Sequence, residues 1–238
     1  MKTRILAIYL TLFLPACVTV DVGNKPVIES HSEQKAESRI ALGVGYLQQG
    51  NMIKAQENLQ KAYQYAPNFY RSQIALAHYY EQVDENSKAE NLYRTALAQH
   101  PNNGNVLNNY GTFLCKQKQY QKADKLFNQA IEKPDYYLIS DSYENAAFCA
   151  LKSKNKAKAI GYFERALDYD PTRYRSSLNL AKLQIEQNKL ADARIRLVRL
   201  TKHHGARKEA IKLMIELEEK AGNQLLVEQY QRQLNTLI

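Results

Sequence analysis

The cysteines and histidines of this 238-residue chain are its first candidates for disulfide formation and metal binding. Cys115 and Cys149 leave two interpretations open, a disulfide bridge or two small thiols in a core. His203 and His204 stand beside Gly205, where a metal site would need further ligands at a useful spacing. No cysteine or acidic cluster accompanies the two histidines, so a solvated turn is the favoured interpretation. The sequence therefore predicts no metal and no cofactor.

Sequence motifs of the common enzyme classes are missing as well. The chain contains no Gly-x-Ser-x-Gly, no His-Glu-x-x-His and no glycine-rich phosphate loop, and it offers no convincing carboxylate pair. Because no residues are available to carry catalysis, we expect a protein that is not an enzyme.

A sparse pattern of small and apolar residues returns five times with a period of about 34 residues. Within each copy the spacing places these residues on one stripe of a first helix and then of a second helix. Close packing of two helices needs a small side chain where they cross. The small residues at the two crossings are Gly43, Ala77, Gly111, Ala147 and Ala181, then Ala55, Ala89, Ala123, Ala159 and Ala193. This pattern resembles the tetratricopeptide repeat, a helix–turn–helix unit that stacks into a solenoid and holds partners.

The repeats predict an all-α, right-handed superhelical solenoid over residues 36–238. Pro67, Pro101 and Pro171 mark repeat boundaries because proline cannot continue the preceding helix. The third unit carries two extra residues near Pro134, so we expect a longer turn there. The predicted units are 36–69, 70–103, 104–139, 140–173, 174–207 and 208–238, the last being a degenerate unit or capping helix pair.

The N-terminus has the features of an export signal. Lys2 and Arg4 precede an apolar run at residues 5–14, which is too short to cross a bilayer. Residues 14–17, Leu-Pro-Ala-Cys, are similar to a bacterial lipobox, in which the cysteine is acylated. We therefore expect a lipoprotein signal peptide at 1–16, lipid on Cys17 and an acylated tether at 17–35. The alternative is an ordinary cleaved signal with a chance cysteine.

The residue after Cys17 indicates a location. An aspartate there often retains such lipoproteins in the inner membrane, whereas Val18 predicts anchoring at the periplasmic face of the outer membrane, in its inner leaflet. A formal net charge of +9 would normally suggest that a protein binds nucleic acid. An exported chain does not meet nucleic acid, so a mixed surface with affinity for anionic lipid or an acidic partner is favoured.

Two segments resemble more than a generic repeat: Asn108–Cys115 (NNYGTFLC) and Tyr143–Cys149 (YENAAFC). Together with Lys133–Tyr136 and Phe163–Leu167, they resemble the type IV pilus biogenesis lipoproteins called PilF or PilW. The resemblance implies a pilotin, an outer-membrane lipoprotein that binds the pilus secretin and promotes its localisation and multimerisation. It also favours a disulfide between Cys115 and Cys149. We expect this protein to act as a monomer.

Two sets of residues are candidates for partner binding. In such solenoids one wall of the groove comes from the first helices, and only the first repeat offers an apolar stripe there. The stripe consists of Ile40, Val44 and Leu47, with Ile74 from the second repeat, while Leu42 and Tyr46 are expected in the core. An amphipathic partner segment would lie on the stripe, unless residues 18–35 fold back and cover it.

The second candidate is a row of asparagines at the same phase of consecutive units. Asn109, Asn145 and Asn179 could each hydrogen-bond an extended peptide, because an amide both donates and accepts. The alternative, which we favour, is a structural role in hydrogen bonds between repeats.

Three functions compete on this sequence. The first is the secretin pilotin, and the second is a lipoprotein adaptor for cell-wall enzymes or outer-membrane protein assembly. The third, an envelope hydrolase with unrecognised residues, is disfavoured by the missing nucleophile and metal ligands.

Overall fold

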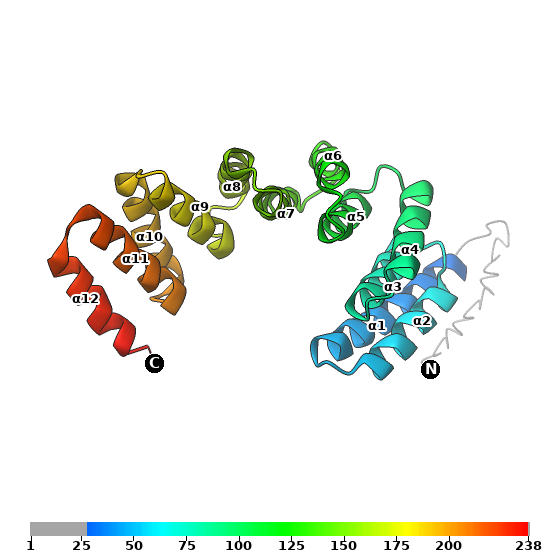
Figure 1. Cartoon of the computed structure of the whole chain (residues 1–238). Helices are drawn as coiled ribbons and strands as arrows, with labels where there is room; N and C mark the ends of the chain where they lie inside the picture. Colours follow the sequence, from blue (N-terminus) through cyan, green and yellow to red (C-terminus); the bar gives the residue numbers. More distant parts are fainter. Residues whose placement is uncertain (1–27, 238) are drawn as a thin grey trace, which may run out of the picture.

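The computed structural model describes residues 28–237, and helices joined by short turns make up this part of the chain. The described residues form an arch, with the first helices in one foot and the last helices in the other (Figure 1). The helices are α1 (Ile28–Gln48), α2 (Met52–Tyr65), α3 (Tyr70–Gln82), α4 (Asn86–Gln99), α5 (Gly104–Lys116), α6 (Tyr120–Ile131), α7 (Ile139–Lys152), α8 (Lys156–Tyr169), α9 (Tyr174–Glu186), α10 (Leu190–His204), α11 (Lys208–Ala221) and α12 (Gln224–Asn235).

The helices pack as six consecutive pairs. Each odd-numbered helix packs against the even-numbered helix that follows it, and each pair packs against the next. The predicted all-α solenoid is confirmed, and α11 and α12 supply the sixth pair. Among residues 28–237, no helix is both long and apolar enough to cross a membrane.

Small residues allow the helices of each pair to approach closely. The alanines at the second-helix crossing, from Ala55 to Ala193, are fully buried. A Cβ added to Gly43 would lie 2.5 Å from Leu59 Cγ, and one added to Gly111 would lie 2.9 Å from the Phe127 ring. The small side chains predicted from the repeat therefore stand where two helices touch.

The turn between the two helices of each unit has a residue with left-handed backbone at the same position. Gly50 opens this series with a φ of 73°, and Gly222 in the sixth pair has a φ of 74°. Non-glycine residues adopt the conformation in between, at φ of 59° to 62°: Asp84, Lys118, Lys154 and Asn188. Left-handed backbone is costly for residues with a Cβ. Asp84 and Asn188 are of types that tolerate this conformation, whereas the stacked helices impose it on Lys118 and Lys154.

The two extra residues of the third unit form a packed joint. Tyr136 follows α6 in the predicted longer turn and is buried, with 4% of its surface exposed. Its hydroxyl lies 2.8 Å from Ser142 Oγ on α7, and a Cβ on Gly104 would overlap its ring. The insertion therefore brings an aromatic side chain into the contact between units three and four.

The first helix begins earlier than the sequence indicated. α1 starts at Ile28, inside the segment 17–35 that was expected to be a tether. After Pro26 the chain has no proline or glycine until Gly43, and helix-favouring residues such as Glu33 and Lys35 let the helix extend. The predicted signal peptide and Cys17 lie outside the described residues.

A buried carboxylate connects the second and third units. Glu81 on α3 accepts hydrogen bonds from Tyr93 Oη at 2.5 Å and from Lys116 Nζ at 2.7 Å. Burial opposes ionisation of Glu81, but the hydrogen bonds from His78, Lys116 and Tyr93 outweigh it and lower its pKa. Glu81 is therefore held as an anion where three helices meet.

This lowered pKa predicts an acid-sensitive joint. A depressed folded-state pKa gives stability that is present above the unfolded pKa and is lost as the pH falls through the folded value. We expect the melting temperature of the wild type to drop on acidification below about pH 4.5. The melting temperature of Glu81→Gln should drop less over the same pH range. Thermal melts at pH 7 and pH 3.5 measure this, and parallel pH profiles would contradict it.

Candidate protein-binding site

The apolar stripe predicted on the first unit is largely packed. Ile40 is buried with 8% of its surface exposed, in a cluster with Ala36, Ala62 and Ala66. The prediction that Ile40 lies exposed in a groove is wrong, because α3 packs on α1 as well as on α2. Ile40 belongs to the core that joins the first two units.

The other three stripe residues are partly buried. Val44 packs against two apolar clusters, the one that contains Ile40 and the one that contains Leu76 and Tyr79. Leu47 packs against the second of these clusters. Ile74 packs against the core of the second and third units. Only the exposed edges of Val44, Leu47 and Ile74 remain available to a partner.

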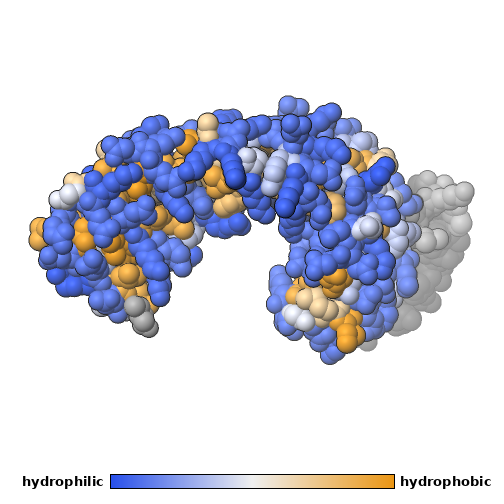
Figure 2. Space-filling model, in the orientation of Figure 1, coloured by the Kyte–Doolittle hydropathy of each residue, from blue (hydrophilic) through white to orange (hydrophobic). Residues whose placement is uncertain are grey.

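Leu42 was expected in the core and is half exposed instead, at 50%. Its counterparts Leu76 and Leu180 are buried because they pack on the preceding unit, and the described residues place no unit before the first. Tyr46, the other expected core residue, is partly buried. Figure 2 shows apolar surface at the end of the arch where α1 and α2 lie.

The asparagine row is engaged within the chain. The Nδ2 groups of Asn109 and Asn179 donate to backbone carbonyls one turn earlier in their own helices, each at 2.8 Å. Asn145 Nδ2 donates to Asn108 Oδ1 at 3.1 Å, between the third and fourth units. Asn145 therefore has the favoured structural role between repeats, whereas the amides of Asn109 and Asn179 bond backbone carbonyls within their own helices.

A disulfide bond joins Cys115 on α5 to Cys149 on α7, with the two sulfurs 2.22 Å apart. Both residues are buried, and the bridge links the first helices of adjacent units. A hollow of about 230 Å³ adjoins the bridge. Arg175 stacks over the Phe148 ring at 4.4 Å, and Lys152 also lines the hollow, so the surface beside the disulfide is cationic.

The histidine pair has an asymmetric role. His204 Nε2 lies 2.7 Å from the carbonyl of Thr172, so the expectation of a merely solvated turn is wrong for this residue. His100 makes the same contact with Asn68 at 2.8 Å, between the first and second units. His203 is exposed, and no cluster of metal-ligating side chains occurs anywhere in residues 28–237.

Comparison with known proteins places this geometry in a family. Models of the tetratricopeptide repeat match residues 36–69, 102–172 and 150–215. An uncharacterized protein of Haemophilus influenzae is 35% identical over 157 residues, which are 65% of this chain and 85% of that protein. The type IV pilus assembly protein PilF of Pseudomonas aeruginosa is 33% identical over 189 residues, which are 79% of this chain and 75% of PilF.

Solved structures agree with this assignment. The structure of Pseudomonas aeruginosa PilF superposes with a TM-score of 0.75 at 30% identity, over 87% of this chain and 93% of that one. The crystal structure of PilW, a type IV pilus biogenesis factor, has the same fold, with a TM-score of 0.74 at 22% identity over 85% and 93% of the two chains. The chain therefore belongs to the tetratricopeptide-repeat family of the type IV pilus assembly protein PilF.

Proposed function

We propose that this chain is an outer-membrane lipoprotein that binds the secretin of a type IV pilus and promotes its localisation and multimerisation. The observation that carries the proposal is the similarity to PilF, which extends over most of both chains in sequence and in structure. Tetratricopeptide repeats hold partners on extended surfaces, which suits assembly of a large membrane complex.

Deletion of the gene tests the proposal. Immunoblots of unheated samples are used to compare secretin multimer with monomer. We expect the high-mass multimer to be lost in the deletion strain and restored by the intact gene. Unchanged multimer together with altered cell shape would instead support an adaptor for cell-wall enzymes.

Acylation of Cys17 is the second element of the proposal. The short apolar run and the lipobox-like residues before Cys17 motivate it. Labelled palmitate should enter the wild-type protein and not Cys17→Ser, and the three acyl chains of a mature lipoprotein should hold the protein firmly in the membrane. Label in the variant, or a wild-type protein recovered entirely in the soluble periplasm, would remove the anchor.

The first unit is the proposed secretin contact, through the exposed edges of Val44 and Leu47. Val44→Thr with Leu47→Gln removes apolar surface without burying a charge, so we expect secretin affinity to fall about tenfold or more. Ile53→Gln is the control, since Ile53 is 81% exposed on the same unit. Co-purification with secretin is measured beside thermal melting, and unchanged affinity with normal melting would move the contact to another unit.

A further inference from the structure

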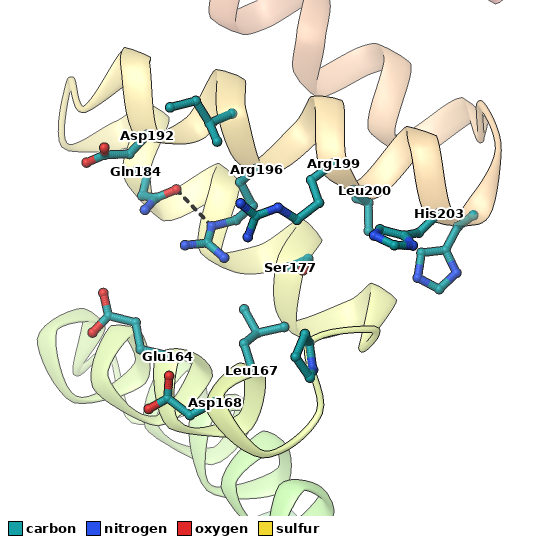
Figure 3. A pocket seen from close by; sticks show the side chains of 13 residues that line it. Glu164, Leu167, Asp168, Ser177, Gln184, Asp192, Arg196, Arg199, Leu200 and His203 are labelled. Carbon is teal, nitrogen blue, oxygen red and sulfur yellow. Dashed lines mark hydrogen bonds between the residues drawn. The ribbon is translucent and has the colours of Figure 1, made fainter.

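A hollow of about 510 Å³ lies between the second helices of units four and five. One wall is α8, the opposite wall is α10, and side chains of α9 form the floor (Figure 3). None of its lining residues belongs to the apolar stripe or the asparagine row described above. Arg196 and Arg199, together with Asp192, line the hollow from α10, and Glu164 and Asp168 line it from α8, so the α10 wall is mainly basic and the α8 wall is acidic.

Arg196, on the basic wall, differs from the residues at its phase in the three preceding units, although unit one has the polar Asn58 there. The residues at its phase in units two to four are Leu92, Leu126 and Tyr162, which pack in apolar clusters. Arg196 is partly buried at this phase, and its Nε donates to Gln184 Oε1 at 3.1 Å. Burial lowers the pKa of its guanidinium, which means that the cation is poorly solvated there.

The guanidinium groups on this wall lack carboxylate partners. Within the described part of the chain, neither Arg196 nor Arg199 forms an ion pair, although the other partly buried arginine of α10, Arg194, forms one with Glu218. Arg196 and Arg199 point toward the same space in Figure 3 and repel each other. Glu164 and Asp192 attract the Arg196 guanidinium through space, but neither carboxylate forms an ion pair with Arg196 or Arg199 among the described residues. Two convergent guanidinium groups that no carboxylate bonds directly can bind a further carboxylate.

The opposite wall is acidic, and the space between the walls holds apolar side chains beside the polar Ser177 and Gln184 of the floor. Glu164 on α8 faces the hollow and has no ion pair among the residues described, while Asp168 is paired with Arg165 at 3.0 Å. Leu167 and Leu200 line the hollow between the charged walls. An occupant that satisfies both walls must carry a negative group, an apolar group and a positive group within a few residues.

We propose that this hollow binds a polypeptide segment of a partner protein in which an acidic side chain faces Arg196 and Arg199 and a basic side chain faces Glu164. The carboxylates of Glu164 and Asp168 disfavour a lipid phosphate or another polyanion, because like charges repel. The size of the hollow suits a few side chains of a peptide. The inference depends on the charges of units four and five and not on the identity of the secretin as partner.

Synthetic peptides on the purified full chain in detergent test the inference. The probe is the acetylated, amidated hexapeptide Ala-Glu-Leu-Ala-Lys-Ala, with three analogues in which Gln replaces Glu, Lys or both. Ligand-observed NMR titrations should rank the Glu/Lys peptide first, the Glu-only peptide second and the other two last. Arg196→Gln should weaken the Glu/Lys peptide about tenfold or more, because a charge-assisted hydrogen bond is lost.

Matched variants separate this site from general charge effects. Lys202→Gln removes a cation from the exposed side of the same helix and should change affinity less than twofold. Glu164→Gln should abolish the preference for the Glu/Lys peptide over the Glu-only peptide, and Arg196→Lys should retain part of the affinity. Thermal melting identifies any variant that fails to fold.

Three results would overturn the inference. They are equal binding of all four peptides, an unchanged affinity in folded Arg196→Gln, or displacement of the peptide by inorganic phosphate or phosphatidylglycerol vesicles at lower concentration than by free peptide. The last result would assign the basic wall to a phosphate group. Because these experiments contain no secretin, their failure leaves the proposed function standing, and failure of the deletion experiment leaves the peptide site standing.

Discussion

Removing the Cys115–Cys149 bridge is expected to lower the free energy of unfolding by about 3 to 4 kcal/mol. The bridge spans 34 residues, and a cross-link of this length restricts the unfolded chain far more than the folded one. It also ties α5 to α7, so units three and four should lose their mutual packing first when it is absent. For a chain of this size the loss corresponds to a drop in melting temperature of about 10 °C.

The measurement compares the wild type with Cys115→Ser/Cys149→Ser, each with and without reductant. Reductant should lower the melting temperature of the wild type to that of the variant and leave the variant unchanged. Alkylation followed by mass measurement reports the thiols directly. If both cysteines are labelled in the native, unreduced protein, the bridge is absent and the chain contains two core thiols instead.

Replacing Arg194 with Met is expected to cost about 3 kcal/mol. The Arg194 guanidinium bonds Glu218 in a bidentate arrangement, at 2.6 Å from Nε and 2.8 Å from the second nitrogen. Glu218 is 1% exposed, so the variant leaves a buried carboxylate without its cation. The pair connects α10 to α11, and the sixth helix pair should therefore detach from the solenoid at a lower denaturant concentration than the other units.

Lys202→Met is the matched control for this prediction, because it removes a cation from an exposed position of the same helix. Hydrogen exchange resolves the units, and faster exchange should be confined to α11 and α12 in Arg194→Met. Arg194→Met combined with Glu218→Met should recover much of the stability, since no buried charge remains. A normal melting curve and normal exchange in the single variant would show that Glu218 does not depend on Arg194.

The repeat architecture could be predicted from the sequence because its signal recurs. The small residues at 34-residue intervals, such as Gly111 and Ala123, are the residues that the helix crossings require. The two extra residues of unit three were also visible in the spacing. The packing of Tyr136 against Gly104 was not, because a contact between two turns has no periodic signature.

The candidate site of the first unit was predicted less well for two reasons. The phase of Ile40 is buried in other units too, at Asn108 and Glu144, and burial at the phase of Leu42 depends on a preceding unit. The phase of Ile40 indicated a groove residue, yet the contact of α3 with α1 buries it. The phase of Leu42 indicated a core residue, yet no preceding unit covers it in the described chain. Position within a unit predicts burial only when both neighbouring units are present.

Arg196 and His204 had signals in the sequence that went unused. Arg196 occupies a phase that is apolar or aromatic in the three preceding units, and such a break in the pattern indicates a role other than packing. His204 has the phase of His100, which makes the same contact with the preceding loop. Comparing units with one another, and not only with the general repeat, would have identified both residues.

The most direct test of the pilus account is co-purification of this chain with the secretin from detergent-solubilised envelopes. The full chain carries a C-terminal affinity tag, and unheated immunoblots detect secretin in the eluate, with Ile53→Gln beside Val44→Thr/Leu47→Gln. We expect secretin in the wild-type and Ile53→Gln eluates and its depletion with the double variant. Two results together would contradict the proposed function. They are the absence of secretin from the eluate of the folded wild-type chain, and normal secretin multimers in cells that lack this chain.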